Sequence, residues 1–573
     1  MRHYLRVLIV STNLLLISCQ FSANSSDYPE ADRIFLDGAI YTLEQSNPWA
    51  EVVAIKDGKI IYVGDKEGVE KYVGESTQKQ DLNGKMLLPG FIDSHAHPVA
   101  GGAYVRSLSL DTFAEPQVWL KQIAEYSKQH PNQKILFGYG FLASAFGDNG
   151  PTSKMLDSVI SDRPVFIMDE GFHGGWANSR AMRLLGINKQ TADPTPGFSY
   201  YKRYASGEAT GYLLEGTAAK AVEQLEIITE SSVALGTVDV LKIMNSYGIT
   251  SVFDAGALDV ENIQVKVLKK IADEKNMTVR IVGAHMIAAP DKLDDVIKVV
   301  IDKKTNTKNP LFHINTLKIM NDGTIEGKTA GMFEDYQGEP DNRGETVFSQ
   351  QQLTGLMTKA SANNLDIHVH ALGERTIHET LNAIEFAQER NPDSNSRYTI
   401  CHLQVMTDKS IQRMAKLNVI AQSTPLWASY DEYGKAFVSD DQFQRYFRFN
   451  SLKKAGVKMA FGSDFPATGA GTLGISPVFN MEIGHTRQSA GEATAPVQPN
   501  IEERLDIATL IKGYTIDGAY QLHLEDKIGS IKVGKLADFV ILDKNLFDVE
   551  TYSIHKVKVI QTILAGNTVY LQE

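Results

Sequence analysis

Residues 86–98 read MLLPGFIDSHAHP, an apolar run that ends in two histidines, His95 and His97. Side chains two positions apart on a β-strand point to the same side, so both imidazoles face one way if this run is a strand. A near-continuous apolar run is typical of a parallel strand that is covered on both faces. Two neutral imidazoles at the end of such a strand form half of a zinc-type metal site.

Downstream of this run, apolar strand-like segments alternate with helical stretches, which is the pattern of βα units around a parallel sheet. The predicted strands are residues 87–95, 250–255, 279–285, 317–321, 366–371, 398–402, 419–423 and 458–464. Most gaps between them hold one crossover helix. The sequence therefore predicts an α/β fold with a (β/α)8 TIM barrel over residues 86–515.

The gap between the first and second predicted strands is much longer than the others, so we expect an insertion over about residues 101–238. Loops at the carboxyl end of barrel strands form the active-site face, and this insertion is expected to cover a substrate pocket. His173, Trp176 and Asn178 lie in its segment FHGGWAN. They either line the pocket or belong to the core and turns of the insertion. Arg487, after the last predicted strand, is a further pocket candidate or else a surface arginine.

Both ends of the chain are rich in β-forming residues. Residues 32–85 contain Asp57-Gly58, a hairpin signal between two β-rich runs, and residues 516–573 contain a turn at Gly566-Asn567. Chain termini often lie close together in space. The two ends are therefore predicted to form one composite β-sandwich domain beside the barrel.

Four further residues with metal-binding chemistry fall where predicted strands stop. These are Lys318, His370, His402 and Asp464, on the predicted strands four, five, six and eight. Taken singly, each has an ordinary explanation, such as a satisfied polar group or a turn residue. Their shared position is informative because catalytic groups in barrels come from the ends of several strands.

Several short motifs resemble those of one known family. The motifs SHAH (94–97), HVHALGE (368–374), CHLQ (401–404) and GSDFP (462–466) resemble the amidohydrolase superfamily. The closest resemblance is to the YtcJ-like, amidohydrolase-3 branch, which includes enzymes similar to N-substituted formamide deformylases. The segments GFHGGWANSRAMRLLGI (171–187) and GSIKVGKLADFVILD (529–543) fit that branch too. The resemblance runs from about residue 31 to the end of the chain.

This resemblance implies a set of ligands for one or two divalent metal ions. The implied ligands are His95, His97, Lys318, His370, His402 and Asp464. His370 is preferred to His368, which faces the same side, because it lies nearer the strand end and directly precedes Ala371 as in the family pattern. Lys318 is implied as a carbamate that bridges two metals, the alternative being an unmodified lysine beside a carboxylate and a single metal. Imidazole and carboxylate ligands suit zinc, and iron, manganese or nickel also fit.

The implied activity is hydrolysis of a non-peptide C–N bond in a small amide, formamide or cyclic amide. A bound divalent metal lowers the pKa of water toward about 7 and so supplies hydroxide. Asp464 is expected to act as general base and then as general acid toward the departing nitrogen. The alternatives are a metal-dependent deaminase, another acyl hydrolase on the same scaffold, or a solute-binding lipoprotein without catalysis.

The composition argues against several other classes of protein. The formal net charge is −12, which makes nucleic acid an unsuitable partner because phosphate binding needs clustered Lys and Arg. With only Cys19 and Cys401 in the chain, no disulfide framework is possible. A small-molecule substrate is therefore expected, and a homodimer is left open.

The amino terminus is predicted to be a targeting segment. Arg2 and Arg6 precede a short apolar run that ends in Leu-Ile-Ser-Cys at residues 16–19, which resembles a bacterial lipobox. Residues 1–18 are then a signal peptide, Cys19 carries lipid, and residues 19–31 form a flexible tether to the membrane. The outer membrane, on its periplasmic side, is the preferred location. The alternatives are an ordinary signal peptide or a retained apolar segment.

Overall fold

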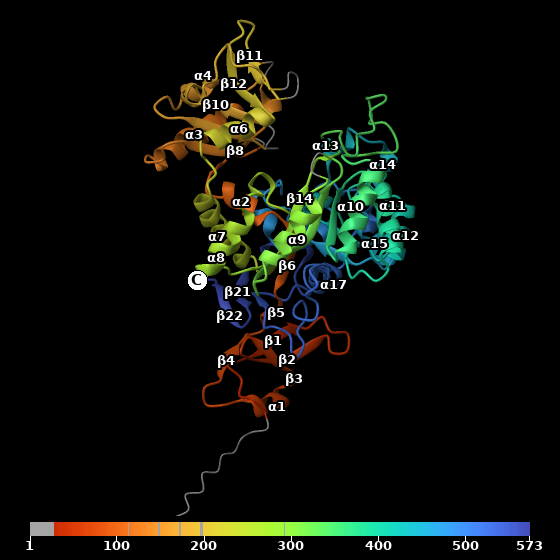
Figure 1. The fold of residues 1–573 in the computed structure, drawn as a ribbon. Coiled ribbons are helices and arrows are strands. Elements are labelled where there is room, and N and C mark those ends of the chain that lie inside the picture. Colours follow the sequence, from red (N-terminus) through yellow and green to blue (C-terminus); the bar gives the residue numbers. More distant parts are fainter. Residues whose placement is uncertain (1–27, 113, 147–148, 171–173, 195–198, 291–292) are drawn as a thin grey trace, which may run out of the picture.

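The computed structural model describes residues 28–112, 114–146, 149–170, 174–194, 199–290 and 293–573. A central barrel lies between a composite β-sheet at one end and an inserted domain at the other (Figure 1). The predicted fold class is confirmed. None of the helices in the described part of the chain has the length and apolarity needed to cross a bilayer.

The barrel consists of parallel strands in sequence order. Its strands are β6 (Phe91–Ala96), β13 (Ile249–Asp254), β14 (Arg280–Ile287), β15 (Phe312–Met320), β16 (Asp366–Ala371), β17 (Tyr398–His402), β18 (Ile420–Ser423) and β19 (Met459–Phe461). Just after β19, the N–H of Asp464 donates to the carbonyl of His95 beside the first strand, at 2.7 Å. The cylinder is therefore nearly closed, and the carboxyl ends of its strands share one rim.

Helices cover the outside of the barrel. They include α7 (Glu230–Ser246), α8 (Gln264–Asp273), α9 (Val296–Asn306), α10 (Gln350–Ala362), α11 (Glu374–Arg390), α12 (Asp408–Lys416), α15 (Phe449–Lys454), α16 (Pro477–Thr486) and α17 (Ile507–Gly513). Local sequence sets several of their starts. Ser349 and Gln352 form a capping box at the start of α10, and the Thr407 hydroxyl accepts the Ser410 N–H at the start of α12.

The first predicted strand is divided in two in the structure. Residues 86–89 form β5 (Met86–Pro89), which pairs with β1 (Arg33–Tyr41) and β20 (Phe539–Leu542) of the composite sheet. The barrel strand β6 begins only after Gly90, whose N–H donates to the Asp538 carbonyl. A Cβ at position 90 would lie 2.3 Å from Thr250 Oγ1, so this crossing from sheet to barrel requires glycine.

The composite sheet joins both ends of the chain into one hydrogen-bonded sheet. Its other strands are β2 (Trp49–Lys56), β3 (Lys59–Gly64), β4 (Gln78–Asp81), β21 (Val559–Leu564) and β22 (Asn567–Leu571). A register shift between Leu36 and Ile40 divides β1, so that its first half pairs with β4 and its second half with β5. The two predicted halves of a sandwich are thus one continuous, bent sheet.

The residues just before β20 close the lower end of the barrel. The chain there forms α18 (Ile516–Gln521) and a turn. In that turn, His523 contacts Asp366 at the start of β16 at 2.8 Å, and Glu525 pairs with Arg397, just before β17. Residues 516–525 therefore contact the barrel, although the sequence assigned them to the second part of the β domain.

The inserted domain has its own mixed sheet and core. Its strands are β7 (Leu108–Ser109), β8 (Leu136–Phe141), β9 (Val165–Asp169), β10 (Gly174–Ala177), β11 (Tyr201–Arg203) and β12 (Ala209–Leu214). Its helices are α3 (Pro116–Gln129), α4 (Ser153–Asp157), α5 (Ser179–Leu184) and α6 (Gly216–Gln224). It connects to the barrel through α2 (Pro98–Tyr104) and α7, which touch at Gly102 and Gly236. The predicted boundary at residue 238 falls inside α7, a helix that packs on the barrel.

Candidate metal centre

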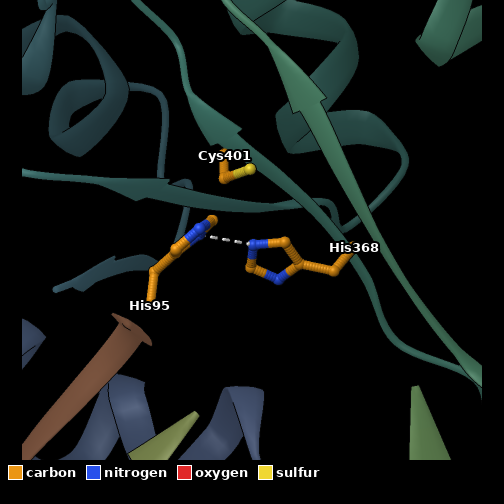
Figure 2. Close-up of side chains that lie close together, drawn as sticks. All are labelled: His95, His368 and Cys401. Carbon is orange, nitrogen blue, oxygen red and sulfur yellow. Dashed lines mark hydrogen bonds between the residues drawn. The ribbon is translucent and has the colours of Figure 1, made fainter. Parts of the chain in front are cut away.

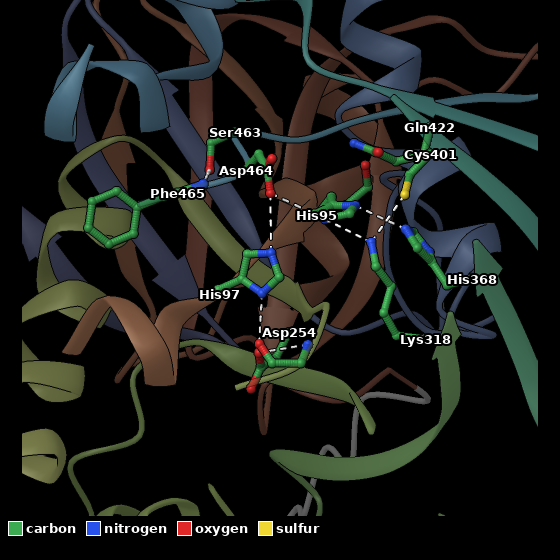
Figure 3. Close-up of polar contacts among 12 residues, drawn as sticks. His95, His97, Asp254, Lys318, His368, Cys401, Gln422, Ser463, Asp464 and Phe465 are labelled. Atoms are coloured by element: carbon green, nitrogen blue, oxygen red, sulfur yellow. Dashed lines mark hydrogen bonds and ion pairs between the residues drawn. The ribbon is translucent and has the colours of Figure 1, made fainter. Parts of the chain in front are cut away.

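The six residues predicted as metal ligands converge at the open rim of the barrel. Figure 3 shows four of them, His95, His97, Lys318 and Asp464. Asp464 Oδ1 lies 3.2 Å from Nε2 of both His95 and His97. Lys318 Nζ lies 3.4 Å from His95 Nε2. The His402 ring lies 4.9 Å from the His95 ring and 4.4 Å from that of His370, measured between ring centroids. His95, Lys318, His370 and His402 lie on the barrel strands to which the sequence assigned them, and His97 and Asp464 lie just after the first and last of these strands.

The tautomer of His97 is set by a backbone carbonyl. His97 Nδ1 lies 2.7 Å from the carbonyl oxygen of Gly256, which can only accept a hydrogen bond. Nδ1 therefore carries the proton and the lone pair of Nε2 faces Asp464. Asp254 supports this arrangement by accepting the Gly256 N–H at 3.3 Å. His97 is thus oriented by the loop that directly follows β13.

A buried carboxyl group ties the first and last barrel strands together. Asp93 accepts hydrogen bonds from the His95 N–H at 3.2 Å and from the Ser463 N–H and hydroxyl at 3.0 and 2.6 Å. Burial raises the pKa of Asp93 to about 7, and these donors oppose that rise. Because Asp93 holds both segments, it sets the position of His95 relative to Asp464.

The backbone is left-handed at two of the strand ends. His402 has φ of +75° and Asp464 has φ of +55°, conformations that cost a non-glycine residue roughly 1 kcal/mol or more. In a regular strand, neighbouring side chains point to opposite faces. Cys401 and His402 nevertheless both face the centre, because the chain turns at His402.

Four imidazoles of the centre are neutral. The pKa values of His95, His368 and His402 lie well below the usual value and that of His370 falls to about 3, with burial as the largest cause. The positive charge of Lys318 and the neighbouring imidazoles lower them further. Neutral imidazole is the form that binds metal.

Asp464 is held in its anionic form. Burial alone would raise the pKa of Asp464, but the neighbouring groups, among them the positive charge of an unmodified Lys318, outweigh it and lower that pKa below its usual value. The centre therefore offers neutral imidazoles together with a carboxylate. This donor set suits a divalent metal.

Several buried atoms of the centre lack a partner that a cation would supply. His370 Nε2, His402 Nδ1 and Asp464 Oδ1 are buried and accept no hydrogen bond from the described residues. The lone pair of His97 Nε2 also faces Asp464 Oδ1 at 3.2 Å, and two acceptors at that distance repel each other. A cation among these atoms removes both problems, so the residues present fit a divalent metal.

Two further residues belong to the cluster: His368, to which His370 was preferred as a ligand, and Cys401, which was not predicted as a site residue. His368 Nε2 lies 2.9 Å from His95 Nδ1 (Figure 2). The His368 ring also stacks on Phe253. Cys401 Sγ lies 3.1 Å from Lys318 Nζ, and burial raises the pKa of its thiol to about 12. The shared strand face of His368 and His370 was a usable signal. Cys401 was not expected in the cluster, because neighbouring residues on a strand point to opposite faces and His402 was assigned to the face of the metal centre.

Asp322 was also missed, and it links two loops at the rim. It accepts the N–H groups of Gly331, Leu372 and Gly373, and its Oδ1 lies 3.7 Å from His370 Nε2. Burial raises the pKa of Asp322 to about 7. It therefore positions the loop that follows His370. The residue has no motif of its own, so only its position just after β15 could have pointed to it.

Two predicted pocket residues of the insertion have structural roles instead. Trp176 is fully buried in the inserted domain, where its Nε1 donates to the Thr152 carbonyl at 2.8 Å and its ring contacts Phe146. Asn178 caps α5 by accepting the Ala181 N–H. The substrate-binding role predicted for Trp176 and Asn178 is therefore corrected, because their polar groups are used inside this domain. His173, in the same segment, lies outside the described residues, as does Cys19.

Arg487 is neither a pocket residue nor a surface residue. It is fully buried, and its guanidinium donates to the backbone carbonyls of Tyr446, Phe447, Gln498 and Pro499 at 2.8–3.1 Å. Every nitrogen of the guanidinium has a carbonyl partner, so none is left for a substrate. The substrate-binding prediction for Arg487 is corrected: this side chain joins loops beside the rim.

Comparison with known proteins decides the family. The profile of the amidohydrolase family matches residues 78–570, which is most of the chain. The protein belongs to the amidohydrolase family. Together with the buried donor set at the rim, this makes it a metal-dependent hydrolase.

Similar amidohydrolases span nearly the whole chain. The putative amidohydrolase YtcJ of Bacillus subtilis is 27% identical, over 94% of this chain and 99% of its own length. The N-substituted formamide deformylase of Arthrobacter pascens is 26% identical, over 93% of this chain and 97% of its own length. An uncharacterized metal-dependent hydrolase from Pyrococcus horikoshii has a similar fold, with a TM-score of 0.72 and 22% identity over 91% of this chain and 99% of that chain.

Proposed function

We propose that this amidohydrolase cleaves a non-peptide C–N bond in an amide, a formamide or a cyclic amide, with Asp464 as general base and acid. The observation that carries this proposal is the position of Asp464 Oδ1, 3.2 Å from Nε2 of both His95 and His97 at the open rim. The deformylase named above supports an amide-type substrate. A deaminase or another acyl hydrolase is the alternative on the same scaffold.

The proposed ligands of the metal are His95, His97, His370, His402 and Asp464. His370 is preferred to His368 because His370 Nε2 has no hydrogen-bond partner among the described residues, whereas His368 Nε2 contacts His95. When bound, a divalent metal such as zinc polarises the substrate carbonyl and lowers the pKa of water.

Lys318 is proposed to carry a carbamate. Its side chain is 1% exposed, and it forms no ion pair within the described part of the chain, so an unmodified ammonium would be buried without a salt-bridge partner. Such burial is costly. Once the ammonium has lost a proton, the neutral amine adds carbon dioxide and releases a second proton to the solvent. The product is a carbamate anion that offers oxygen ligands, which supports a two-metal centre over the single-metal alternative.

The remaining chemistry belongs to Asp464. As the carboxylate it takes a proton from the attacking water, and as the acid it returns that proton to the departing nitrogen. A positioned acid–base group of this kind contributes about 10²–10⁴-fold to the rate. The burial of the surrounding imidazoles keeps bulk water away from this exchange.

Metal removal tests the proposed hydrolysis. Dialysis against a chelator is expected to lower amide hydrolysis at least about 100-fold, and added zinc or manganese to restore it, since a metal supplies several kcal/mol of transition-state stabilisation. The measurement uses a panel of N-formyl amines, N-acyl amino acids, cyclic ureas and aminopurines. Turnover of aminopurines alone would favour the deaminase. A metal-free purified protein that turns over no compound would favour a solute-binding protein.

We also propose that the protein is an exported lipoprotein anchored through Cys19, on the periplasmic side of the outer membrane. The sequence LISC at residues 16–19 supports this. Cys19→Ser is expected to move the protein from the membrane to the soluble fraction without changing kcat or KM, because the anchor lies far in sequence from the rim. The check is membrane fractionation, with Cys401→Ser as the matched control that stays in the membrane. Membrane retention of Cys19→Ser would contradict the anchor.

A further inference from the structure

A cavity of about 410 Å³ lies beside the metal centre. This is within the size range of small-molecule sites. Its wall includes Glu326, Leu372, Trp427, Tyr430, Asp431 and Phe447. Three of these are aromatic and one is aliphatic, the other lining residues include several with hydroxyl or amide groups, and apolar atoms form most of the lining surface.

The cavity adjoins the proposed ligands. Leu372 follows His370 by two residues. The Trp427 ring packs against the His402 ring, with centroids 5.5 Å apart. If the C–N bond of a substrate lies at the metal centre, the substituent attached to that bond therefore extends into this cavity.

The charged residues of the wall are both acidic. They are Glu326 and Asp431, and neither forms a salt bridge within the described part of the chain. Each carboxylate is held at one oxygen, Glu326 by the Gln404 amide at 3.0 Å and Asp431 by the Gly434 N–H at 2.8 Å. Glu326 as a whole is an exposed residue, but desolvation of its carboxyl group and the charge of Asp431 raise its pKa. Both acids line the same cavity, and no lysine or arginine among its lining residues compensates them.

We propose that this cavity is a specificity subsite for an aromatic or similar apolar group that carries a cationic amine, and that it excludes carboxylates. The inference rests on the proposed hydrolysis of C–N bonds at the adjoining centre. Trp427, Tyr430 and Phe447 provide apolar surface and ring faces that attract cations. Glu326 and Asp431 give the amine its partner. A carboxylate there would face two like charges without a counter-ion.

Three formamides of one shape test the subsite. They are N-formylbenzylamines with an aminomethyl, a methyl or a carboxyl group in the para position. Because hydrogen bonds to charged groups contribute about 1.5–3 kcal/mol, kcat/KM is expected to be at least about tenfold higher for the aminomethyl than for the methyl compound. The carboxyl compound is expected to be the slowest of the three. Equal rates, or a preference for the carboxyl compound, would overturn the subsite.

Variants assign the effect to the two acids. Glu326→Gln and Asp431→Asn are each expected to reduce the preference for the aminomethyl over the methyl compound by several-fold, and the double variant to remove it. Glu334→Gln, an exposed acid outside the cavity wall, is the control and should keep the full preference. An unchanged preference in the double variant would contradict the assignment.

A binding measurement separates this inference from the proposed function. Benzylamine and benzoate are titrated calorimetrically into the metal-free protein, where turnover plays no part. Tighter binding of benzylamine, lost in the double variant, supports the subsite even if none of the formamides is hydrolysed, an outcome that would refute only the proposed hydrolysis. Equal or tighter binding of benzoate refutes the subsite even if all three formamides are cleaved.

Discussion

Replacement of Asp464 by Asn is expected to lower kcat at least about 10³-fold while the protein stays folded. The change removes the acid–base group, which alone is worth about 10²–10⁴-fold, and weakens one metal ligand. The fold should survive because Asn has nearly the same volume and keeps the backbone hydrogen bond from residue 464 to His95 across the barrel. Steady-state kinetics and a thermal unfolding curve measure the two effects.

Asp440→Asn is the matched control for this variant. Asp440 is exposed in the first turn of the short helix α14 (Asp440–Gln444), so the same chemical change there should leave kcat unchanged. A value of kcat for Asp464→Asn within tenfold of the unmodified enzyme would remove Asp464 from the proposed mechanism. It would then act only as one ligand among several.

Replacement of Lys318 by Met is expected to halve the bound metal and to lower kcat/KM at least about 100-fold. A carbamate supplies ligands to both ions of a two-metal centre, and Met supplies no oxygen. Met also fits the largely apolar length of the lysine side chain, so the barrel should still form. Elemental analysis of the purified protein gives the metal content.

The control for Lys318→Met is Lys269→Met, on the exposed side of α8. It should keep the metal content and the activity. Addition of ¹³C-labelled bicarbonate to the unmodified enzyme gives a second readout, a carbamate signal in the NMR spectrum that is absent in Lys318→Met. Full metal content in Lys318→Met, without that signal in the unmodified enzyme, would indicate a plain lysine.

Local sequence was sufficient to predict the barrel and the residues at its rim. Apolar runs mark buried parallel strands, and the polar residue at the end of each run lies at the shared rim in any closed parallel barrel. His95, His370 and Asp464 could therefore be assigned to one place without knowledge of the packing. This reasoning failed at Gly90. The residues on both sides of it are apolar, so the sequence did not show that the chain passes there from the composite sheet to the barrel.

Residues whose surroundings come from distant segments were predicted less well. Trp176 and Arg487 have side chains suited to a pocket, but both are used inside the protein by backbone carbonyls that lie elsewhere in the chain. Cys401 enters the cluster only because the backbone turns at His402. Glu326 and Asp431 come from loops after different strands, and nothing in either loop indicates that they share one cavity.

The order of chemical groups along the chain thus specified a barrel with imidazoles, a lysine and a carboxylate at its strand ends, because strand periodicity is a short-range property. Contacts between residues far apart in the sequence decided the rest. They set the hydrogen-bond partner of each polar group, the tautomer of His97 and the charge of the neighbouring cavity. Those contacts form only when the barrel closes. For this reason the tertiary structure was needed to show which polar side chains can contact a substrate and which ones hydrogen-bond to buried backbone groups.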